Sequence, residues 1–127
     1  MNKSTLEDHL AKSNLEGGRT IWASHKFKFD YIFNILQKYF IDKKSILDIG
    51  VGDGYWLKLC NKKGLKCTGI DISEYLVNIL NNKYSEIEFI NFNISQYSTD
   101  KKYDIISSLD CLEHIHPNEI NNALKNI

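Results

Sequence analysis

Three glycines in alternate positions follow a short apolar run and could together bind an anionic group. The apolar run is Ile46 to Ile49, and the glycines are Gly50, Gly52 and Gly54. Glycine lets the chain turn sharply and lets a ligand approach the backbone, because no Cβ stands in the way. A helix that begins after this loop would offer free N–H groups and a partial positive charge. Both features suit the carboxylate or the phosphate of a ligand.

A carboxylate stands at the end of the next apolar run. Asp71 ends the run that begins at Lys66, which reads Lys-Cys-Thr-Gly-Ile-Asp. In an open α/β sheet, ligands bind at the carboxyl edge of the strands. The glycine loop and Asp71 are therefore expected at the same edge, where a carboxylate can accept hydrogen bonds from both hydroxyls of a ribose.

A third group of reactive side chains lies in the segment from Asp110 to His116. If this segment is helical, Asp110, Glu113 and His114 share one face at positions i, i+3 and i+4. An imidazole there can act as a general base. Carboxylates with one imidazole also suit Mg²⁺ or Mn²⁺.

Strands and helices that alternate along the chain must position these groups. Buried runs predict strands at Ser45 to Ile49, Lys66 to Asp71, Ile87 to Asn93 and Asp104 to Leu109. Amphipathic spacing and capping residues predict helices at His25 to Phe40, from the glycine loop to about Lys63, from Glu74 to about Lys83 with Ser73 as its cap, at Leu112 to Ile115 and at Pro117 to Ile127. This order implies an α/β fold with an open parallel sheet.

Size and composition limit the classes of protein. The chain has 127 residues, which is enough for one domain, and 43% of them are hydrophobic and 25% charged. The net charge is zero and Arg19 is the only arginine, which argues against a nucleic-acid-binding surface. No apolar run approaches the roughly 20 residues needed to cross a membrane. Three cysteines without C-x-x-C spacing suit a reducing compartment, so a cytoplasmic protein is expected.

The sequence resembles the class I (Rossmann-like) S-adenosylmethionine-dependent methyltransferases. The first motif of that family is an acidic residue, one apolar residue and G-x-G-x-G, and the matching residues here are Asp48, Gly50, Gly52 and Gly54. The resemblance continues through "GIDIS", with Asp71 at the ribose-binding position, and through "YDIISSLDCLEHI". It covers about residues 45 to 116 and is nearest to the small-molecule O- and N-methyltransferases.

The resemblance implies a Rossmann-like sheet with the strand order 3-2-1-4. Residues 1–44 are then an N-terminal arm and cap helix, and residues 45–127 are the donor-binding half of a domain that stops before strands 5 to 7. The fourth strand would be left as an open edge. Three explanations for that edge remain open. The favoured one is that the chain is a truncated piece of a longer protein; the others are a split enzyme completed by a partner chain, and self-association across the edge.

The resemblance also assigns roles to individual residues. The donor-binding residues that it implies are Asp48, Gly50, Gly52, Gly54, Asp71, Ile72, Asn93, Ile94 and Leu109. Among them, Ile72 and Ile94 would sandwich the adenine. Asn93 stands where the family often has an acidic residue for the adenine amino group, and its carbonyl oxygen can accept the same hydrogen bond.

The catalytic candidates are His114, Glu113 and Asp110. Their D-x-x-E-H pattern is similar to the E-x-x-E-H metal set of the ubiquinone-pathway O-methyltransferases and of the small-RNA 3′-end 2′-O-methyltransferases. Glu-His at this place is also widespread in metal-independent relatives. We therefore do not expect a metal, and these three residues are its ligands if one is bound.

The expected function is transfer of a methyl group from S-adenosylmethionine to an oxygen or nitrogen of a small molecule. Two alternatives remain: a non-catalytic module that binds S-adenosylmethionine, and one subunit of a split enzyme that needs a partner chain. A fragment of an NAD-binding dehydrogenase is disfavoured, because the sixth position of G-x-G-x-x-G/A is Tyr55. A Walker-type phosphate loop is excluded, because no G-K-[ST] follows the glycines.

Overall fold

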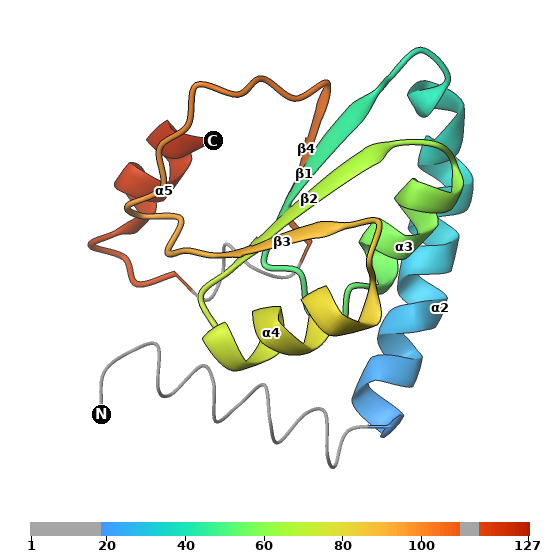
Figure 1. The fold of residues 1–127 in the computed structure, drawn as a ribbon, viewed down its shortest axis with the longest axis horizontal. Coiled ribbons are helices and arrows are strands. Elements are labelled where there is room, and N and C mark those ends of the chain that lie inside the picture. The colour runs from blue at the N-terminus through green and yellow to red at the C-terminus, as the bar shows by residue number, and fades with distance from the viewer. Residues whose placement is uncertain (1–18, 110–114) are drawn as a thin grey trace.

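The computed structural model of the chain describes residues 19–109 and 115–127, and only the backbone within residues 19–25. Four parallel strands form one sheet in the order β3-β2-β1-β4 (Figure 1). Their bounds are Ser45–Ile49 for β1, Lys66–Asp71 for β2, Glu88–Asn91 for β3 and Ile105–Ser107 for β4. The predicted α/β fold and its strand order are confirmed.

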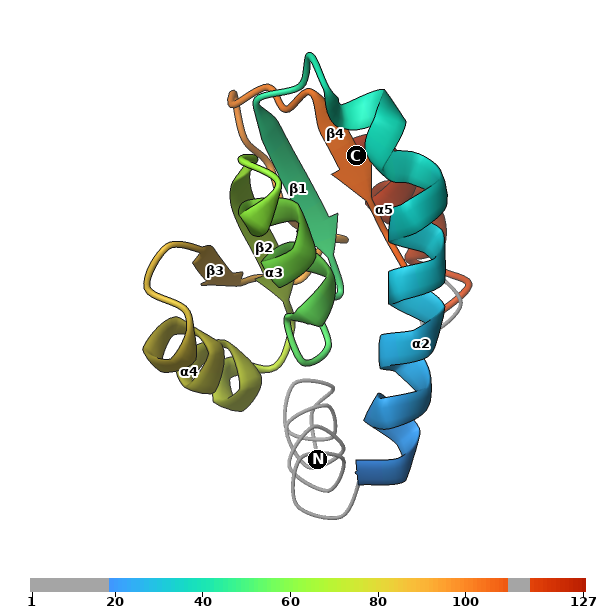
Figure 2. The ribbon, with the colours of Figure 1, turned by 90° about the vertical axis from the view of Figure 1, so that its right-hand side faces the viewer.

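Helices cover both faces of the sheet. Their bounds are Arg19–Leu36 for α2, Gln37–Phe40 for the 3-10 helix η1, Tyr55–Lys62 for α3, Glu74–Lys83 for α4 and Ile120–Asn126 for α5. The helices α2, α3 and α4 lie on one face and α5 lies on the other (Figures 1 and 2). In the part of the chain that the structure describes, no helix is both long and apolar enough to span a bilayer.

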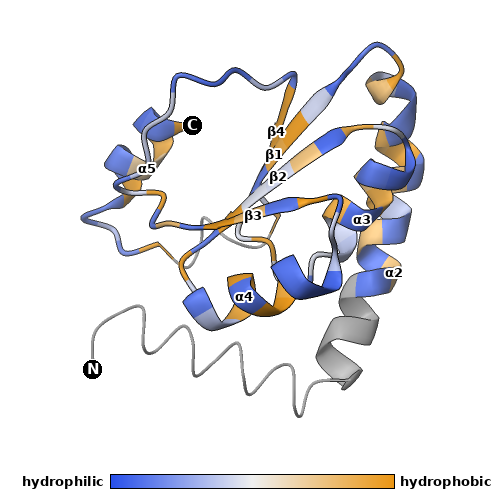
Figure 3. Ribbon diagram, in the orientation of Figure 1, coloured by the Kyte–Doolittle hydropathy of each residue, from blue (hydrophilic) through white to orange (hydrophobic). Residues whose placement is uncertain are grey.

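The strands bury side chains on both faces, as expected for a covered parallel sheet. Along β1, Ile46 belongs to the core beneath α2, α3 and α4. Its neighbour Leu47 and the next alternate residue, Ile49, belong to the core beneath α5, which includes Ala123. Hydrophobic residues accordingly dominate β1 and β4 (Figure 3). Asp48 shares the face of Ile46, because side chains alternate along a strand.

Gly69 in the middle of β2 allows α3 to approach the sheet. A Cβ at this position would lie 2.4 Å from Cγ1 of Val51 and 2.9 Å from Cδ1 of Leu57. Real Cβ atoms do not make contacts this short, so a larger residue would displace either the helix or the loop before it. The close packing of Val51 and Leu57 against Gly69 of β2 therefore helps to position the glycine loop.

The central elements have the bounds expected from the sequence, and the predicted cap is present. The strands β1 and β2 cover the predicted residues. The hydroxyl of Ser73 accepts a hydrogen bond from the backbone N–H of Leu76 at 3.1 Å and caps α4.

Both outer strands are shorter than predicted. The chain leaves β3 at Asn91 and turns at Asn93, whose Oδ1 accepts a hydrogen bond from the N–H of Ser95 at 3.0 Å. Before β4, the N–H of Asp104 donates to Oγ of Ser45 at 3.1 Å instead of joining the strand ladder. One side-chain hydrogen bond thus follows the early end of β3, and another precedes the late start of β4.

The outer helices also differ from the prediction. The N-terminal helix begins at Arg19, before the predicted His25, and its last turn becomes the 3-10 helix η1. The last helix begins at Ile120 and not at Pro117, because the segment before it forms a turn. In that turn the ring Nδ1 of His116 accepts from the N–H of Asn118 at 3.1 Å. The helix predicted at Leu112 to Ile115 lies mostly outside the described residues.

Candidate functional site

The glycine loop connects β1 to α3 at the carboxyl edge of the sheet. Gly50, Gly52 and Gly54 have φ angles of +77°, +57° and +79°, a conformation that other residues adopt only with strain. The N–H of Gly50 donates to the carbonyl of Ile70 on β2 at 2.9 Å. The N–H of Gly54 donates to the carbonyl of Val51 at 3.0 Å and closes the turn.

Two of these glycines meet different surroundings. A Cβ on Gly54 would lie 3.1 Å from Cε2 of Tyr84 and 3.2 Å from Cδ2 of Leu80, so packing against α4 leaves little room there. A Cβ on Gly52 would meet no atom within 4 Å, and this residue is exposed. Packing therefore does not fill the space above Gly52, and a ligand can approach its backbone closely.

Asp71 lies at the end of β2 beside this loop, as the sequence predicts. Its Oδ2 accepts a hydrogen bond from the N–H of Val51 at 3.1 Å. Its Oδ1 accepts from the N–H of Ser73 at 2.9 Å. The side chain thus joins the glycine loop to the turn that begins α4.

A second carboxylate, that of Asp53, lies within the loop itself. Its Oδ1 accepts a hydrogen bond from the N–H of Tyr55, the first residue of α3, at 3.0 Å. The N–H groups of Gly52 and Asp53 have no acceptor among the residues that the structure describes. The start of α3 therefore carries a negative charge, and two successive amides of the loop remain for a ligand.

The third carboxylate is that of Asp48, which is buried with 2% of its surface exposed. Ser107 on β4 donates its hydroxyl to Oδ1 of Asp48 at 2.7 Å, and the indole N–H of Trp56 donates to Oγ of Ser107 at 3.1 Å. Burial raises the pKa of Asp48 to about 7, the hydrogen bond from Ser107 opposes this shift, and the charge of Asp71 adds to it.

Sequence reasoning did not identify Ser107 or Trp56. Their roles depend on the register of β1 and β4, in which Asp48 lies opposite Ser107. Two strand residues in register on parallel strands share a face of the sheet, which in this case is the face covered by α3. The pairing of strands so far apart in the sequence gives no local signal.

The residues expected around the adenine lie on and after β2 and β3. Ile72 is half-buried and belongs to neither core. Ile94 is 7% exposed and packs in the core beneath α5, and the adenine contacts of Ile72 and Ile94 stay predictions. Asn93 uses its Oδ1 for the N–H of Ser95, and Leu109 is half-buried against the other core.

An asparagine that the sequence did not single out supports the same turn. The Nδ2 of Asn91 donates to the carbonyls of Asp71 and Ile72, at 3.1 Å and 2.9 Å. One amide side chain therefore fixes the backbone that directly follows the Asp71 side chain.

The catalytic candidates Asp110, Glu113 and His114 lie outside the described residues. Within residues 19–109 and 115–127, no group of three or more His, Cys, Asp or Glu side chains is arranged to hold a metal ion. Cys60 and Cys67 are buried free thiols, and burial raises the pKa of Cys67 to about 12. Neither thiol is available as a nucleophile at neutral pH.

Tyr55 connects the start of α3 to the N-terminal helix. Its hydroxyl donates to Oδ1 of Asp30 on α2, and burial, together with this hydrogen bond, raises the pKa of Tyr55 to about 12. The side chain therefore points to α2 from the position at which a dinucleotide-binding loop has its third glycine. This contact agrees with the sequence pattern, which disfavours a dinucleotide site.

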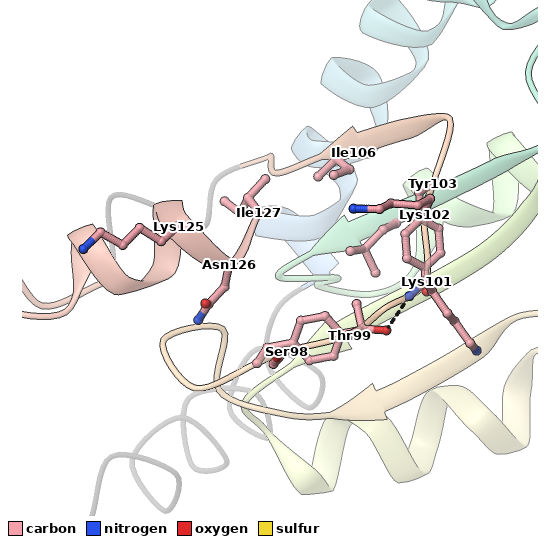
Figure 4. A pocket seen from close by; sticks show the side chains of 11 residues that line it. Ser98, Thr99, Lys101, Lys102, Tyr103, Ile106, Lys125, Asn126 and Ile127 are labelled. Carbon is pink, nitrogen blue, oxygen red and sulfur yellow. Dashed lines mark hydrogen bonds between the residues drawn. The ribbon is translucent and has the colours of Figure 1, made fainter.

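A cavity of about 290 Å³ lies away from this edge, between α5 and the face of β1 and β4 (Figure 4). It is lined by Leu47, Tyr97, Ser98, Thr99, Lys101, Lys102, Tyr103, Ile106, Lys125, Asn126 and Ile127. None of these residues belongs to the glycine loop or to the turn that directly follows β2. The cavity is therefore separate from the candidate site.

Comparison with known proteins identifies a family match that includes the glycine loop and the whole sheet. Residues 23–127 match a family model described as "Methyltransferase domain". The chain is 27% identical over 129 residues to the ribosomal RNA large subunit methyltransferase E of a Wolbachia species, a match that covers 91% of the chain and 55% of the relative. It is 30% identical over 87 residues to a ubiquinone biosynthesis O-methyltransferase of Coxiella burnetii, which covers 64% of the chain and 37% of the relative.

A solved structure agrees on the fold. Magnesium protoporphyrin IX methyltransferase from Synechocystis PCC 6803, with bound S-adenosylmethionine, superposes with a TM-score of 0.75 at 19% identity. The match covers 99% of the chain and 70% of that structure. The chain spans about half or less of the length of the two curated relatives.

Proposed function

The chain belongs to the class I S-adenosylmethionine-dependent methyltransferase family, and on that basis we propose that its glycine loop and Asp71 hold the methyl donor. We further propose that the whole protein transfers the methyl group to an oxygen or nitrogen of a small molecule. The donor-binding residues of the proposal are Asp48, Gly50, Gly52, Gly54, Asp71, Ile72, Asn93 and Leu109.

The observation that carries the proposal is the charge around the loop. Three carboxylates, those of Asp48, Asp53 and Asp71, lie in the loop or at the ends of the strands beside it. S-adenosylmethionine carries a sulfonium and an ammonium group, so both of its cations gain from nearby carboxylates. The phosphates of NAD or ATP would be repelled by the same side chains.

The backbone of the loop fits the remaining groups of the donor. Gly52 leaves open space above its Cα, and the N–H groups of Gly52 and Asp53 suit the carboxylate of the amino-acid part. Asp71 suits the ribose, because a carboxylate accepts about four hydrogen bonds and can take a diol beside backbone amides. The residues present therefore fit the donor.

The bound donor supplies a methyl group that is already activated by its positive sulfur, so most of the remaining task is orientation. The loop, Asp71 and Ile72 would hold the donor in one pose. His114 is the proposed general base for an acceptor hydroxyl, with Glu113 and Asp110 beside it in the sequence.

The zero net charge of the chain favours a small acceptor over RNA. The net charge is zero with one arginine, whereas RNA binding draws most of its affinity from cationic contacts with phosphates. One relative is by its name a ribosomal RNA methyltransferase and another an O-methyltransferase of ubiquinone biosynthesis, so the family alone does not decide the acceptor.

A thermal shift assay of the chain tests donor binding. The ligands are S-adenosylmethionine, S-adenosylhomocysteine, NAD and ATP, each at the same concentration. A donor at a hundred times its dissociation constant raises the free energy of unfolding by about 2.7 kcal/mol. The proposal requires a shift with the first two ligands, and a shift with NAD or ATP alone contradicts it.

The edge strand supports a second candidate, a donor-binding subunit that is completed by another chain. Among the described strands, β4 pairs only with β1, and Ile106 on β4 is 41% exposed. An open edge of this kind pairs readily with another strand. Donor binding without conversion to S-adenosylhomocysteine, and with self-association by light scattering, would favour this candidate.

A further inference from the structure

Asp48, Ser107 and Trp56 form a hydrogen-bonded relay through three elements of the fold. Ser107 on β4 donates to Oδ1 of Asp48 on β1 at 2.7 Å, and Trp56 on α3 donates to Oγ of Ser107 at 3.1 Å. Asp48 and Ser107 lie opposite each other in the register of β1 and β4. All three side chains therefore meet between the sheet and α3.

The chemistry of the three groups determines which of them donates in each hydrogen bond. An indole N–H donates and has no acceptor, so Ser107 must accept from Trp56. The hydroxyl has one hydrogen, and a carboxylate can only accept, so that hydrogen goes to Asp48. The relay thus presents a donor to the ionised form of Asp48, and hydrogen bonds of this charge-assisted kind are the stronger ones.

The surroundings of Asp48 oppose ionisation. Asp48 and Trp56 are each 2% exposed, and a buried charge without a hydrogen bond is costly. The charged group that faces Asp48 from β2 is Asp71, which also disfavours a second negative charge. The thiols of Cys60 on α3 and Cys67 on β2 are neutral, because burial raises the pKa of both.

At neutral pH the charged and neutral forms of Asp48 are therefore nearly balanced. Burial and Asp71 raise the pKa of Asp48 to about 7 even with the hydrogen bond from Ser107 in place. A loss of that one hydrogen bond is therefore enough to change the charge of Asp48 at neutral pH.

We propose that Ser107 and Trp56 are positioning residues for donor binding, which hold Asp48 ionised and aligned so that it can attract the cationic methyl donor. This inference rests on the proposed function, since it takes S-adenosylmethionine as the ligand of the site. It adds to that function a pair of residues that touch the donor only through Asp48, and it makes donor affinity depend on pH near neutrality.

The test measures the charge of Asp48 without the donor and the donor affinity separately. Carboxyl carbon NMR of the full chain follows the titration of Asp48 from pH 5 to 9. Calorimetry with S-adenosylmethionine follows the dissociation constant over the same range. The variants are Ser107→Ala, which removes the hydroxyl, Ser107→Thr, which keeps it, and Trp56→Phe, which keeps a ring but removes the N–H.

Ser107→Ala is expected to move the Asp48 titration up by about one pH unit. The ionised fraction at pH 7 then falls and donor affinity weakens about fivefold, with recovery at pH 9. Ser107→Thr should restore the wild-type profile, and Trp56→Phe should shift it in the same direction as Ser107→Ala by a smaller amount.

Ser108→Ala is the matched control. The hydroxyl of Ser108 donates to the carbonyl of Ile49 at 3.4 Å and not to a carboxylate. Its removal should leave the Asp48 titration and the pH profile of binding unchanged.

An unchanged Asp48 titration in Ser107→Ala overturns the relay, even if the donor binds the wild-type chain. A weaker affinity that is equal at every pH also overturns it, because that result indicates a structural role alone. A wild-type chain that binds no donor at any pH overturns the proposed function instead, and the NMR titration of the donor-free chain identifies that case.

Discussion

The carboxylate of Asp71 accepts a hydrogen bond from the backbone N–H of Val51 at 3.1 Å, so the end of β2 is tied to the middle of the glycine loop. The other oxygen of the carboxylate accepts from the N–H of Ser73 at 2.9 Å. One side chain therefore shapes the site and also faces the edge at which we place the ribose. An experiment on Asp71 must separate these two roles.

Asp71→Asn is expected to abolish the thermal shift with S-adenosylmethionine and to weaken donor binding at least about tenfold, because the amide cannot accept at both positions. The free energy of unfolding should fall by about 1–2 kcal/mol from the lost amide contacts. Calorimetry gives the first quantity and urea denaturation the second.

Asp104→Asn is the matched control for Asp71→Asn. Asp104 also accepts a backbone N–H, that of Lys44 at 2.6 Å, but it lies at the amino end of the sheet. The Asp104→Asn variant should be less stable than the wild type but should bind the donor with the same affinity. If Asp71→Asn folds and binds the donor as the wild type does, the ribose has been misplaced.

Gly52→Ala is expected to reduce donor affinity, because a methyl group would occupy the open space above the loop. Gly64→Ala is its control: Gly64 has a φ of +98°, and a Cβ there also meets nothing within 4 Å. Both variants should lose about 1 kcal/mol of stability from backbone strain. Equal donor affinity in the two variants, measured by calorimetry, would contradict the placement of the donor.

Asp48→Asn is expected to remove a pH dependence of stability. The pKa of Asp48 is raised from 3.8 to about 7 on folding, so between these values the folded chain holds a proton that the unfolded chain releases. The free energy of unfolding of the wild type therefore decreases as the pH rises from about 4 to 7, by a total of about 4 kcal/mol from this group. Above pH 7 this cost is fully present.

Urea denaturation of the donor-free chain at pH 5, 6, 7 and 8 checks this prediction. Asp48→Asn should be more stable than the wild type at pH 8, and the difference should shrink toward pH 5. A difference that is constant over this range would show that Asp48 does not titrate there.

Removal of metal is expected to have no effect on donor binding. The proposed donor site consists of glycines, backbone amides and carboxylates that already have hydrogen-bond partners. The thermal shift with S-adenosylmethionine should therefore be the same in EDTA, Mg²⁺ and Mn²⁺. A shift that appears only with Mg²⁺ or Mn²⁺ would instead assign Asp110, Glu113 and His114 to a metal site.

The parts of the fold that could be predicted are those fixed by local sequence. The bounds of β1 and β2 follow from short buried runs that end at a glycine loop and at Asp71. The cap of α4 at Ser73 is predictable because it needs only a hydroxyl that accepts a hydrogen bond from the backbone N–H three residues later. The edge that carries the site follows from strand order alone.

The parts that could not be predicted depend on contacts distant in the sequence. The end of β3 and the start of β4 lie beside side-chain hydrogen bonds, such as that from the N–H of Asp104 to Ser45. The relay depends on the register of Asp48 and Ser107. The packing of Ile94 in the core beneath α5 follows the turn at Asn93 and could not be seen from its residue type.

Trp56 contacts both the aromatic core beneath α2 and the hydrogen-bonded pair of Ser107 and Asp48. Its ring lies among Phe29, Phe33 and Phe40, with centroid distances of 6.3, 5.9 and 6.4 Å, while its nitrogen donates to Ser107. The chain has two tryptophans, so replacing Trp22 with phenylalanine leaves Trp56 as the sole indole emitter. The wavelength and intensity of the Trp56 emission would then report on the packing of α2 against its ring. The same emission would also report on whether Asp48, the hydrogen-bond partner of Ser107, is ionised.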